Sequence, residues 1–333
     1  MTINEIKEKL EKTGYIANED ILYAISGTLN EKTPLLIEGD PGCGKTYLAK
    51  AVAEMLNTKL IRVQFYDGIT PDKILYDYDY QKQLLSIEAI RSTLNNSMKN
   101  MTPEEAMEKA GSINFYGKNF LIKRPVLQAL TEDKAPVLLL DEIDKSSEEL
   151  EYSLLEILDE FSMTIPQYGT ITCPEEKRPY VFLTSNRCRE LSDALRRRCS
   201  YLYIDNKTED EIREIIKRQT NLDEEQAKNA AKCLAALQGP YSDLKQKPSI
   251  AEGIEWTKHI EQNKDEKPVE SIYMLAKNKH DRDILKQIMT TDMTFIANAN
   301  NVKETTTKTK TMEMAEEIAS LPQMFGWMDK NKS

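Results

Sequence analysis

The sequence predicts an α/β fold in which a parallel β-sheet is covered by helices on both faces and a smaller all-helical region follows. Two observations carry this prediction. Five short apolar runs of strand length are separated mostly by segments with helical periodicity, an alternation typical of parallel sheets. From Thr208 onward the pattern is entirely helical. The five predicted strands span residues 35–38, 60–64, 137–141, 180–185 and 200–204.

Composition is that of an ordinary globular chain. The 333 residues are 40% hydrophobic and 30% charged, and no apolar run approaches the roughly 18 residues of a membrane span. Met1–Glu5 lacks the layout of a signal peptide, so we expect a cytoplasmic protein. The net charge of −10 disfavours nonspecific binding to nucleic acid. Scattered cysteines favour neither a disulfide framework nor a zinc site: Cys43, Cys173, Cys188, Cys199 and Cys233.

The remaining elements are predicted from helical spacing. Before the first strand, Ile3, Ile6 and Leu10 indicate a short helix, and Asn18 is placed to cap a second one. After the last strand, amphipathic helices are predicted at 208–219, 223–238, 248–261 and 270–289. The polar segment 300–311 is predicted to be a linker. The expected domains are therefore a sheet domain, a helical domain, and a linker with a helical tail: residues 1–205, 206–298 and 299–333.

A glycine-rich loop joins the first predicted strand to a helical pattern. Its spacing, G-x-x-x-x-G-K-[ST], runs from Gly39 to Thr46. Glycines let backbone N–H groups turn toward a polyphosphate, and the following helix adds its dipole. We expect Lys45 to reach the phosphates of ATP and the Thr46 hydroxyl to bind Mg²⁺, whereas a plain glycine-rich turn is the alternative. The predicted nucleotide-binding residues are Gly39, Asp40, Pro41, Gly42, Cys43, Gly44, Lys45, Thr46 and Tyr47.

Two further strands end in polar side chains. The run Val137–Leu140 leads into Asp141, which would hold Mg²⁺ through water, and Glu142, which would polarise the attacking water. The strand at 180–185 leads into Asn186, whose amide would hold the same water from the far side. Alone, each could be an ordinary strand end entering a solvated loop. The order of the three motifs favours nucleotide hydrolysis.

These motifs resemble those of the AAA+ ATPases, with Walker A at 39–46, Walker B at 137–142 and sensor 1 at Asn186. Within that superfamily the chain is similar to the MoxR family, and there to the CoxD-like proteins associated with carbon monoxide dehydrogenase maturation. The likeness covers about residues 10–290. It rests further on the stretches Tyr78–Leu85, Leu140–Lys145, Leu195–Cys199 and Lys247–Glu252.

The resemblance implies a Mg²⁺-dependent ATPase of the P-loop AAA+ fold that forms a homo-oligomeric ring, usually a hexamer. Such rings remodel or mature a protein partner in the manner of a chaperone, commonly beside a von Willebrand factor A domain protein. In them an arginine reaches the neighbouring subunit's nucleotide. Arg196, Arg197 and Arg198 match that position, with Arg198 favoured. The alternative is a basic helix end stabilised by the helix dipole.

Two inserts in the chain match the family pattern, and one position departs from it. Residues 67–112 match the helix 2 insert and residues 162–178 the pre-sensor 1 β-hairpin. Both are candidates for contacting a partner, or else tolerated surface insertions. Where family members often carry a sensor 2 arginine, this chain has Ser249. The candidates to replace that charge are Lys245, Lys247 and Arg282.

Two other functions stay open on the sequence: an AAA+ motor that acts on nucleic acid, and a nucleotide-dependent binding switch with little turnover. Basic and aromatic residues interleaved in the hairpin would favour the motor. Residues 162–176 contain Tyr168 as their one aromatic residue and no Lys or Arg. We therefore expect a protein client, while strong stimulation of turnover by DNA would reverse this order.

Overall fold

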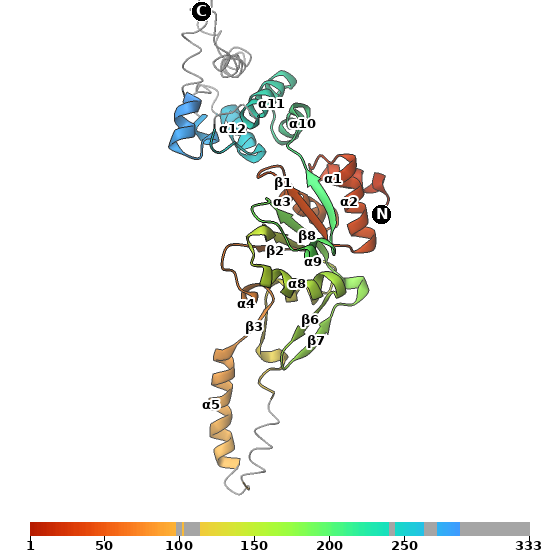
Figure 1. The fold of residues 1–333 in the computed structure, drawn as a ribbon, viewed down its shortest axis with the longest axis vertical. Coiled ribbons are helices and arrows are strands. Elements are labelled where there is room, and N and C mark those ends of the chain that lie inside the picture. Colours follow the sequence, from red (N-terminus) through yellow and green to blue (C-terminus); the bar gives the residue numbers. More distant parts are fainter. Residues whose placement is uncertain (98–101, 103–113, 240–243, 263–271, 287–333) are drawn as a thin grey trace, which may run out of the picture. The chain divides into compact units, whose positions relative to one another are not determined.

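The computed structural model describes residues 1–97, 102, 114–239, 244–262 and 272–286. Its main sheet has five strands in the order β2-β5-β8-β1-β9 (Figure 1). Their bounds are β1 Leu35–Gly39, β2 Leu60–Gln64, β5 Val137–Asp141, β8 Tyr180–Ser185 and β9 Ser200–Ile204. The five predicted strands are thus confirmed, with β1 one residue longer than expected.

The central strands are parallel, and almost all of their residues are buried. β5 pairs in parallel with β2 and with β8, and β8 pairs in parallel with β1. All five residues of β1 and of β5 are buried, because each of these strands has a neighbour on both sides and helices over its faces. Parallel strands end at one edge of a sheet. The polar residues after β5 and β8 therefore lie side by side there.

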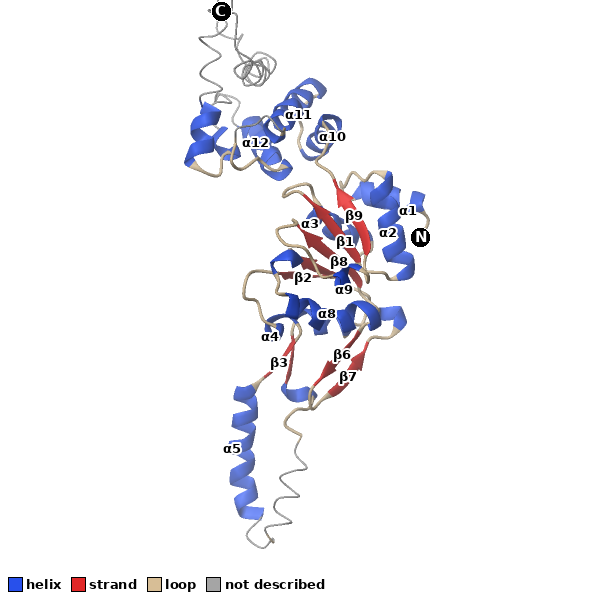
Figure 2. Cartoon of the chain, in the orientation of Figure 1, coloured by secondary structure: helices blue, strands red, loops and turns tan. Residues whose placement is uncertain are grey.

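Helices flank this sheet (Figure 2). Buried side chains of two of them, such as Val126 and Leu154, join strand residues such as Leu138 and Val181 in one hydrophobic core. The predicted N-terminal helix and the helix after Asn18 are both present. The helices of this part of the chain are α1 Ile3–Lys12, α2 Glu19–Glu31, α3 Lys45–Met55, α4 Pro71–Ile74, α7 Pro125–Leu130, α8 Glu148–Glu160 and α9 Asp193–Arg196.

Both predicted inserts contain additional elements. The expected hairpin consists of β6 Ser162–Ile165 and β7 Gly169–Thr172, which pair antiparallel. The longer insert holds β3 Tyr76–Tyr78 and α5 Tyr80–Ser97, and β3 pairs antiparallel with β4 Leu121–Lys123. A 3₁₀ turn, η1 Lys118–Phe120, precedes β4. Residues 98–101 and 103–112 of this insert lie outside the described residues.

After β9 the described residues are mainly helical, as predicted, with one correction. α10 Glu209–Gln219, α11 Glu224–Gln238 and α12 Ile250–Gln262 lie within two residues of the predicted bounds. The single helix expected at 270–289 is wrong: η4 Ile272–Leu275 ends in a break, and a new helix begins at residue 279. The break has a capping cause, because the Asn278 carbonyl oxygen Oδ1 accepts from the Asp281 backbone N–H at 2.8 Å.

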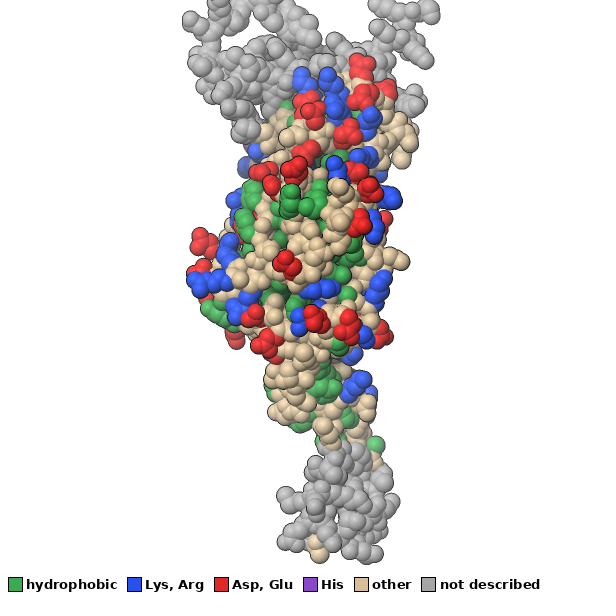
Figure 3. Space-filling model, turned by 90° about the vertical axis from the view of Figure 1, so that its right-hand side faces the viewer, with side chains coloured by type: hydrophobic (Ala, Val, Ile, Leu, Met, Phe, Trp, Pro, Cys, Tyr) green, Lys and Arg blue, Asp and Glu red, His purple; other side chains and the backbone are tan. Residues whose placement is uncertain are grey.

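The chain divides into two compact units. One contains Met1–Lys9, Glu19–Glu38 and Thr46–Tyr203, and the other contains Leu10–Asn18, Gly39–Lys45 and the chain from Ile204 onward. The domain limits at 205 and 298 stay predictions, and the linker at 300–311 with the tail lies outside the described residues. Among the described helices none is long and apolar enough to cross a membrane. Basic and acidic side chains are interspersed over the face shown in Figure 3.

Candidate nucleotide site

The glycine-rich loop connects β1 to α3 in the expected strand, loop and helix order. Gly39 has no side chain because a Cβ there would lie 2.4 Å from the Ile204 carbonyl oxygen. Gly42 has a φ of +86°, which disfavours any residue with a Cβ, and a Cβ there would lie 2.8 Å from Cβ of Ser249. The loop backbone is thus held against neighbouring backbone on both sides, and only glycine fits at these positions.

Lys45 begins α3 and turns back over the loop that precedes it. Its side chain is buried, and its Nζ donates to the carbonyl oxygens of Gly39 at 2.7 Å and Asp40 at 2.8 Å. Asp40 is fixed in turn, because Asn206 Nδ2 donates to its carboxylate at 3.0 Å. Burial raises the pKa of the Cys43 thiol, so this cysteine is neutral and fills space in the loop. The neighbouring Tyr47 is exposed on α3.

The structure brings Thr46 and Asp141 together across 95 residues of sequence. Asp141 is 1% exposed at the end of β5, and its Oδ1 accepts from the hydroxyls of Thr46 at 2.9 Å and Thr184 at 2.5 Å. A threonine hydroxyl beside a buried carboxylate is a pair of hard oxygen ligands, the chemistry that Mg²⁺ prefers. The residues present therefore fit the predicted metal role.

A basic residue that sequence reasoning missed occupies the other oxygen of Asp141. Arg62, on β2, donates to Asp141 Oδ2 from Nε at 2.9 Å and from Nη2 at 2.5 Å, and Nη2 also contacts Gln64 Oε1. Along β2 buried and exposed residues alternate, which places Arg62 and Gln64 on the same side of the strand. That alternation was the available signal, but only the pairing of β2 with β5 reveals the partner.

Glu142 follows Asp141 in a left-handed backbone conformation, with φ 59° and ψ 47°. A non-glycine residue in this region is strained, and such strain collects at functional sites. Its N–H donates to the Thr184 hydroxyl at 2.9 Å, which fixes the backbone turn after β5. The Glu142 carboxylate forms an ion pair with Lys145 Nζ at 2.6 Å, and this hydrogen bond raises the pKa of Lys145. The two adjacent acids thus have separate partners.

Asn186 follows directly after β8, the strand that neighbours β5. Its backbone N–H donates to Asp144 Oδ2 at 3.2 Å, so the turn after β5 and the turn after β8 are joined by a hydrogen bond. Asp144 is buried within the turn η2 Ile143–Lys145 that follows Glu142. Sensor 1 and Walker B are therefore linked through a residue that the sequence did not single out.

The three arginines at the end of α9 and directly after it differ in their surroundings. Arg196 Nη2 pairs with the buried Glu38 carboxylate of β1 at 2.9 Å. Arg198 Nε pairs with Asp159 at 3.1 Å, and its Nη1 donates to the Ala194 carbonyl at 2.9 Å. Arg197 is exposed. Arg197 and Arg198 stay the predicted residues for action on a neighbouring subunit.

The position expected for sensor 2 lies against the glycine-rich loop but carries a hydroxyl. Ser249, next to Gly42, exchanges hydrogen bonds with Glu252: its N–H donates to the carboxylate at 2.7 Å and its Oγ accepts from the Glu252 N–H at 3.3 Å. Lys247 donates to the carbonyl oxygens of Gln238 and Gly239 at the end of α11, so its ammonium serves as a helix cap.

Comparison with known proteins agrees with this geometry. Residues 34–199 match the family model of the AAA domain of the dynein-related subfamily. Two curated relatives are the Lon protease of Fusobacterium nucleatum subsp. nucleatum, 27% identical over 62% of this chain, and Lon protease 1 of Bacillus subtilis (strain 168), 26% identical over 65% of this chain. The aligned regions span 22% and 23% of those proteins. The matched AAA domain and the parallel sheet around its phosphate loop support an ATP-binding AAA+ protein.

Proposed function

We propose that the chain hydrolyses ATP with Mg²⁺ and uses the hydrolysis to remodel or activate a protein partner. The observation that carries the chemical part is the contact between Thr46 and Asp141, with Glu142 next in the chain. Lys45 and the loop N–H groups would hold the phosphates, and Thr46 with Asp141 would hold Mg²⁺, which would neutralise phosphate charge. Glu142 would orient and deprotonate the attacking water, with Asn186 as its second contact.

The strained backbone of Glu142 supports its role as the residue that positions water. Its carboxylate is separated from Asp141 and bound by Lys145, a surface lysine that can exchange for other partners. Substitution Glu142→Gln should keep nucleotide binding and lower kcat by orders of magnitude, because only the deprotonating group is removed. A steady-state ATPase assay beside nucleotide binding measures both. Unchanged turnover in this variant would remove the mechanism.

The ring assembly and the arginine acting between subunits belong to the same proposal. Arg198, or Arg197, would neutralise charge on the transferred phosphoryl group of the neighbouring subunit, which makes hydrolysis depend on assembly. An Arg198→Ala protein mixed with a Lys45→Ala protein should regain part of the ATPase activity, because some interfaces then combine an intact site with an intact arginine. Rings shown to be mixed but without recovered activity would argue for a role within one chain.

A protein client is favoured over nucleic acid. The curated relatives of the AAA domain are named as proteases, the net charge is −10, and the hairpin residues 162–176 hold no Lys or Arg. The MoxR-like stretches of the sequence point to metalloenzyme maturation beside a von Willebrand factor A protein, which we adopt as the specific form of the proposal.

The client is tested with a variant that binds ATP without turning it over. Glu142→Gln protein with ATP serves as bait in a pull-down from native lysate, with ADP as control and parallel samples with and without nuclease. Capture of a von Willebrand factor A protein or a metalloenzyme subunit with ATP alone supports the proposal, because hydrolysis can drive a cycle only if the two nucleotide states differ in affinity. Partners that disappear with nuclease would promote the nucleic-acid motor instead.

A further inference from the structure

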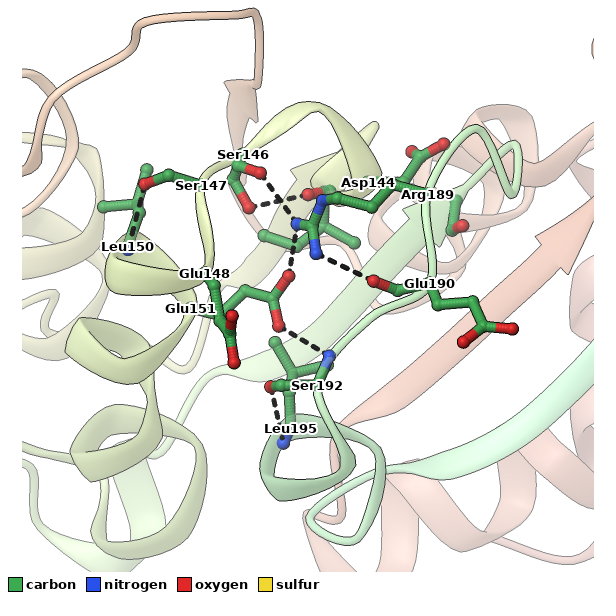
Figure 4. A network of polar contacts seen from close by, with 12 residues as sticks. Asp144, Ser146, Ser147, Glu148, Leu150, Glu151, Arg189, Glu190, Ser192 and Leu195 are labelled. Atoms are coloured by element: carbon green, nitrogen blue, oxygen red, sulfur yellow. Dashed lines mark hydrogen bonds and ion pairs between the residues drawn. The ribbon is translucent and has the colours of Figure 1, made fainter.

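Residues 186–192 join β8 to α9. The first residues of this segment are bonded to the turn that follows β5, residues 142–146, which we call the Walker B turn. Figure 4 shows the polar network that surrounds it. Asp144 Oδ2 accepts from the backbone N–H groups of Asn186 at 3.2 Å and Cys188 at 2.9 Å. One buried carboxylate oxygen therefore fixes two residues of the sensor 1 segment to the turn that carries Glu142.

The middle and the end of the same segment are held by an ion pair between a buried carboxylate and a partly exposed guanidinium. Glu151, on α8, is 0% exposed, and its Oε1 contacts Arg189 Nη2 (Figure 4). Glu151 Oε2 accepts from the Ser192 backbone N–H at 2.9 Å. Arg189 also donates from Nη2 to the Ser146 carbonyl at 2.7 Å. The guanidinium thus joins the Walker B turn to α8, and α8 in turn holds Ser192.

Ser192 is the first residue of the stretch 192–198, which contains α9 and the three arginines and which we call the arginine turn. Its Oγ caps α9 by accepting from the Leu195 N–H at 3.4 Å, and α9 leads directly into Arg197 and Arg198. A continuous set of polar contacts therefore runs from the Walker B turn through Arg189 and Glu151 to the start of the arginine turn. No residue of this set is a predicted ligand of nucleotide or metal.

Packing alone does not require this pair. α8 already buries apolar side chains, among them Leu150 and Leu154, in the core of the sheet. A buried carboxylate must be desolvated, so an ion pair in such a place stabilises a fold less than apolar packing would, but it fixes one geometry because both charges need their partners. Here the geometry fixed is the path of residues 186–192.

We propose that Arg189 and Glu151 are positioning residues for ATP hydrolysis: they hold residues 186–192 so that the arginine turn keeps a set place relative to the Walker B turn and moves with it. The inference rests on the proposed function, in which Arg198 or Arg197 acts on a neighbouring subunit. A change in the Walker B turn of one subunit would then shift the arginine that acts on the neighbouring subunit. The contacts that couple the two run through Asp144, Arg189, Glu151 and Ser192.

The first test removes the charge and keeps the shape. Glu151→Gln should lower kcat about tenfold or more and leave the Kd for ATP within about twofold, because misplacement of a catalytic group is costly while the phosphate loop is untouched. Arg189→Lys, which keeps the positive charge, should retain more turnover than Arg189→Met. The matched control is Glu149→Gln on the exposed face of α8, which should behave as the unsubstituted protein.

The second test asks whether the pair acts through the arginine turn. Glu151→Gln is added to whichever of Arg198→Ala and Arg197→Ala lowers turnover, and it should then lower kcat by less than about twofold further, because the group being positioned is already gone. Full multiplication of the two effects would overturn the inference. So would a Glu151→Gln protein with normal kcat, or one whose loss of turnover tracks its loss of thermal stability and vanishes on cooling.

The design separates this inference from the proposed function. A wild-type protein without ATP turnover, or an Arg198→Ala protein with normal turnover and a normal Arg197→Ala counterpart, overturns the proposed function and this inference with it. Normal kcat in Glu151→Gln, measured beside an inactive Glu142→Gln and an impaired Arg198→Ala, overturns this inference alone.

Discussion

Two buried aspartates, Asp141 at the end of β5 and Asp281 in the helical region, are held by different kinds of partner. Asp141 is 1% exposed and accepts from the side chains of Thr46, Thr184 and Arg62. Asp281 is 0% exposed and accepts from the backbone N–H groups of Lys245 at 2.9 Å and Gln246 at 3.0 Å. The Asn278 side-chain amide also donates to the Asp281 carboxylate, at 2.6 Å.

The difference separates a site from a structural contact. Side chains can rotate away from a carboxylate, so in the proposed function Asp141 would exchange a hydroxyl or a guanidinium for a metal ion and its waters. Backbone N–H groups cannot leave without unfolding the segment that carries them. Burial by itself raises the pKa of Asp281, but the N–H groups of Lys245 and Gln246 and the Asn278 amide together hold that pKa below its usual value. Asp281 therefore stays charged and anchors the chain.

The largest effect is expected at Asp141. Asp141→Asn should lower kcat by about 10²- to 10³-fold, because it removes the charge that would hold Mg²⁺ while an amide oxygen can still accept from Thr184. ATPase assays measure the loss of kcat, and thermal unfolding measures whether the fold is kept. Normal ATP hydrolysis by this variant would show that Asp141 is a structural residue like Asp281, and would contradict the difference drawn between the two.

Asp281 should show the opposite profile. Asp281→Ala should lower the free energy of unfolding by roughly 2–4 kcal/mol, because the backbone N–H groups of Lys245 and Gln246 lose their acceptor. Urea unfolding followed by circular dichroism measures the change. Asp283→Ala, at an exposed position two residues on, is the matched control and should unfold as the wild type does. Equal stability of the two variants would show that Asp281 is no anchor.

Arg62 tests whether the partners of Asp141 do exchange. The guanidinium and a metal ion need the same carboxylate, so Arg62→Gln should raise the apparent Mg²⁺ affinity by about three- to tenfold. The readout is a Mg²⁺ titration of fluorescent ADP binding rather than turnover. Lys59→Gln removes a positive charge just before β2 that pairs with Glu132 instead, and should leave the titration unchanged. Weaker Mg²⁺ binding in Arg62→Gln would mean that Arg62 orients the carboxylate for the metal.

The smallest effect is a pH dependence at Asp281. Because its folded pKa lies below the unfolded value, its contribution to stability is present above about pH 4 and is lost as the pH falls through the folded pKa. The difference in melting temperature between wild type and Asp281→Asn should therefore shrink from pH 5 toward pH 3, values set by the usual pKa of an aspartate of about 3.9. A difference that stays constant would show that the charge of Asp281 contributes nothing.

Much of the sheet and its motifs could be predicted from local patterns. A strand buried on both faces must be apolar along its length, so the runs Val137–Leu140 and Tyr180–Leu183 are recognisable as strands from the sequence. The polar residues that follow them mark the strand ends. The glycine-rich loop is equally local, because its backbone conformation selects the residues. The helical region was less predictable: residues 270–289 have helical spacing, yet a new helix begins at residue 279, where the Asn278 side chain accepts from the Asp281 backbone N–H.

The sequence by itself determined the five strands of the main sheet, most of the helices, their order and the motif residues Lys45, Thr46, Asp141 and Glu142, because backbone conformation and burial select residue types over short windows. The tertiary structure alone decided the partners. Arg62 meets Asp141 across 79 residues, Arg189 meets Glu151 across 38, and Lys245 meets Asp281 across 36. Each of these contacts joins a charge to a group on another element, and a charge carries no signal in its own neighbourhood of which distant group will desolvate and bind it.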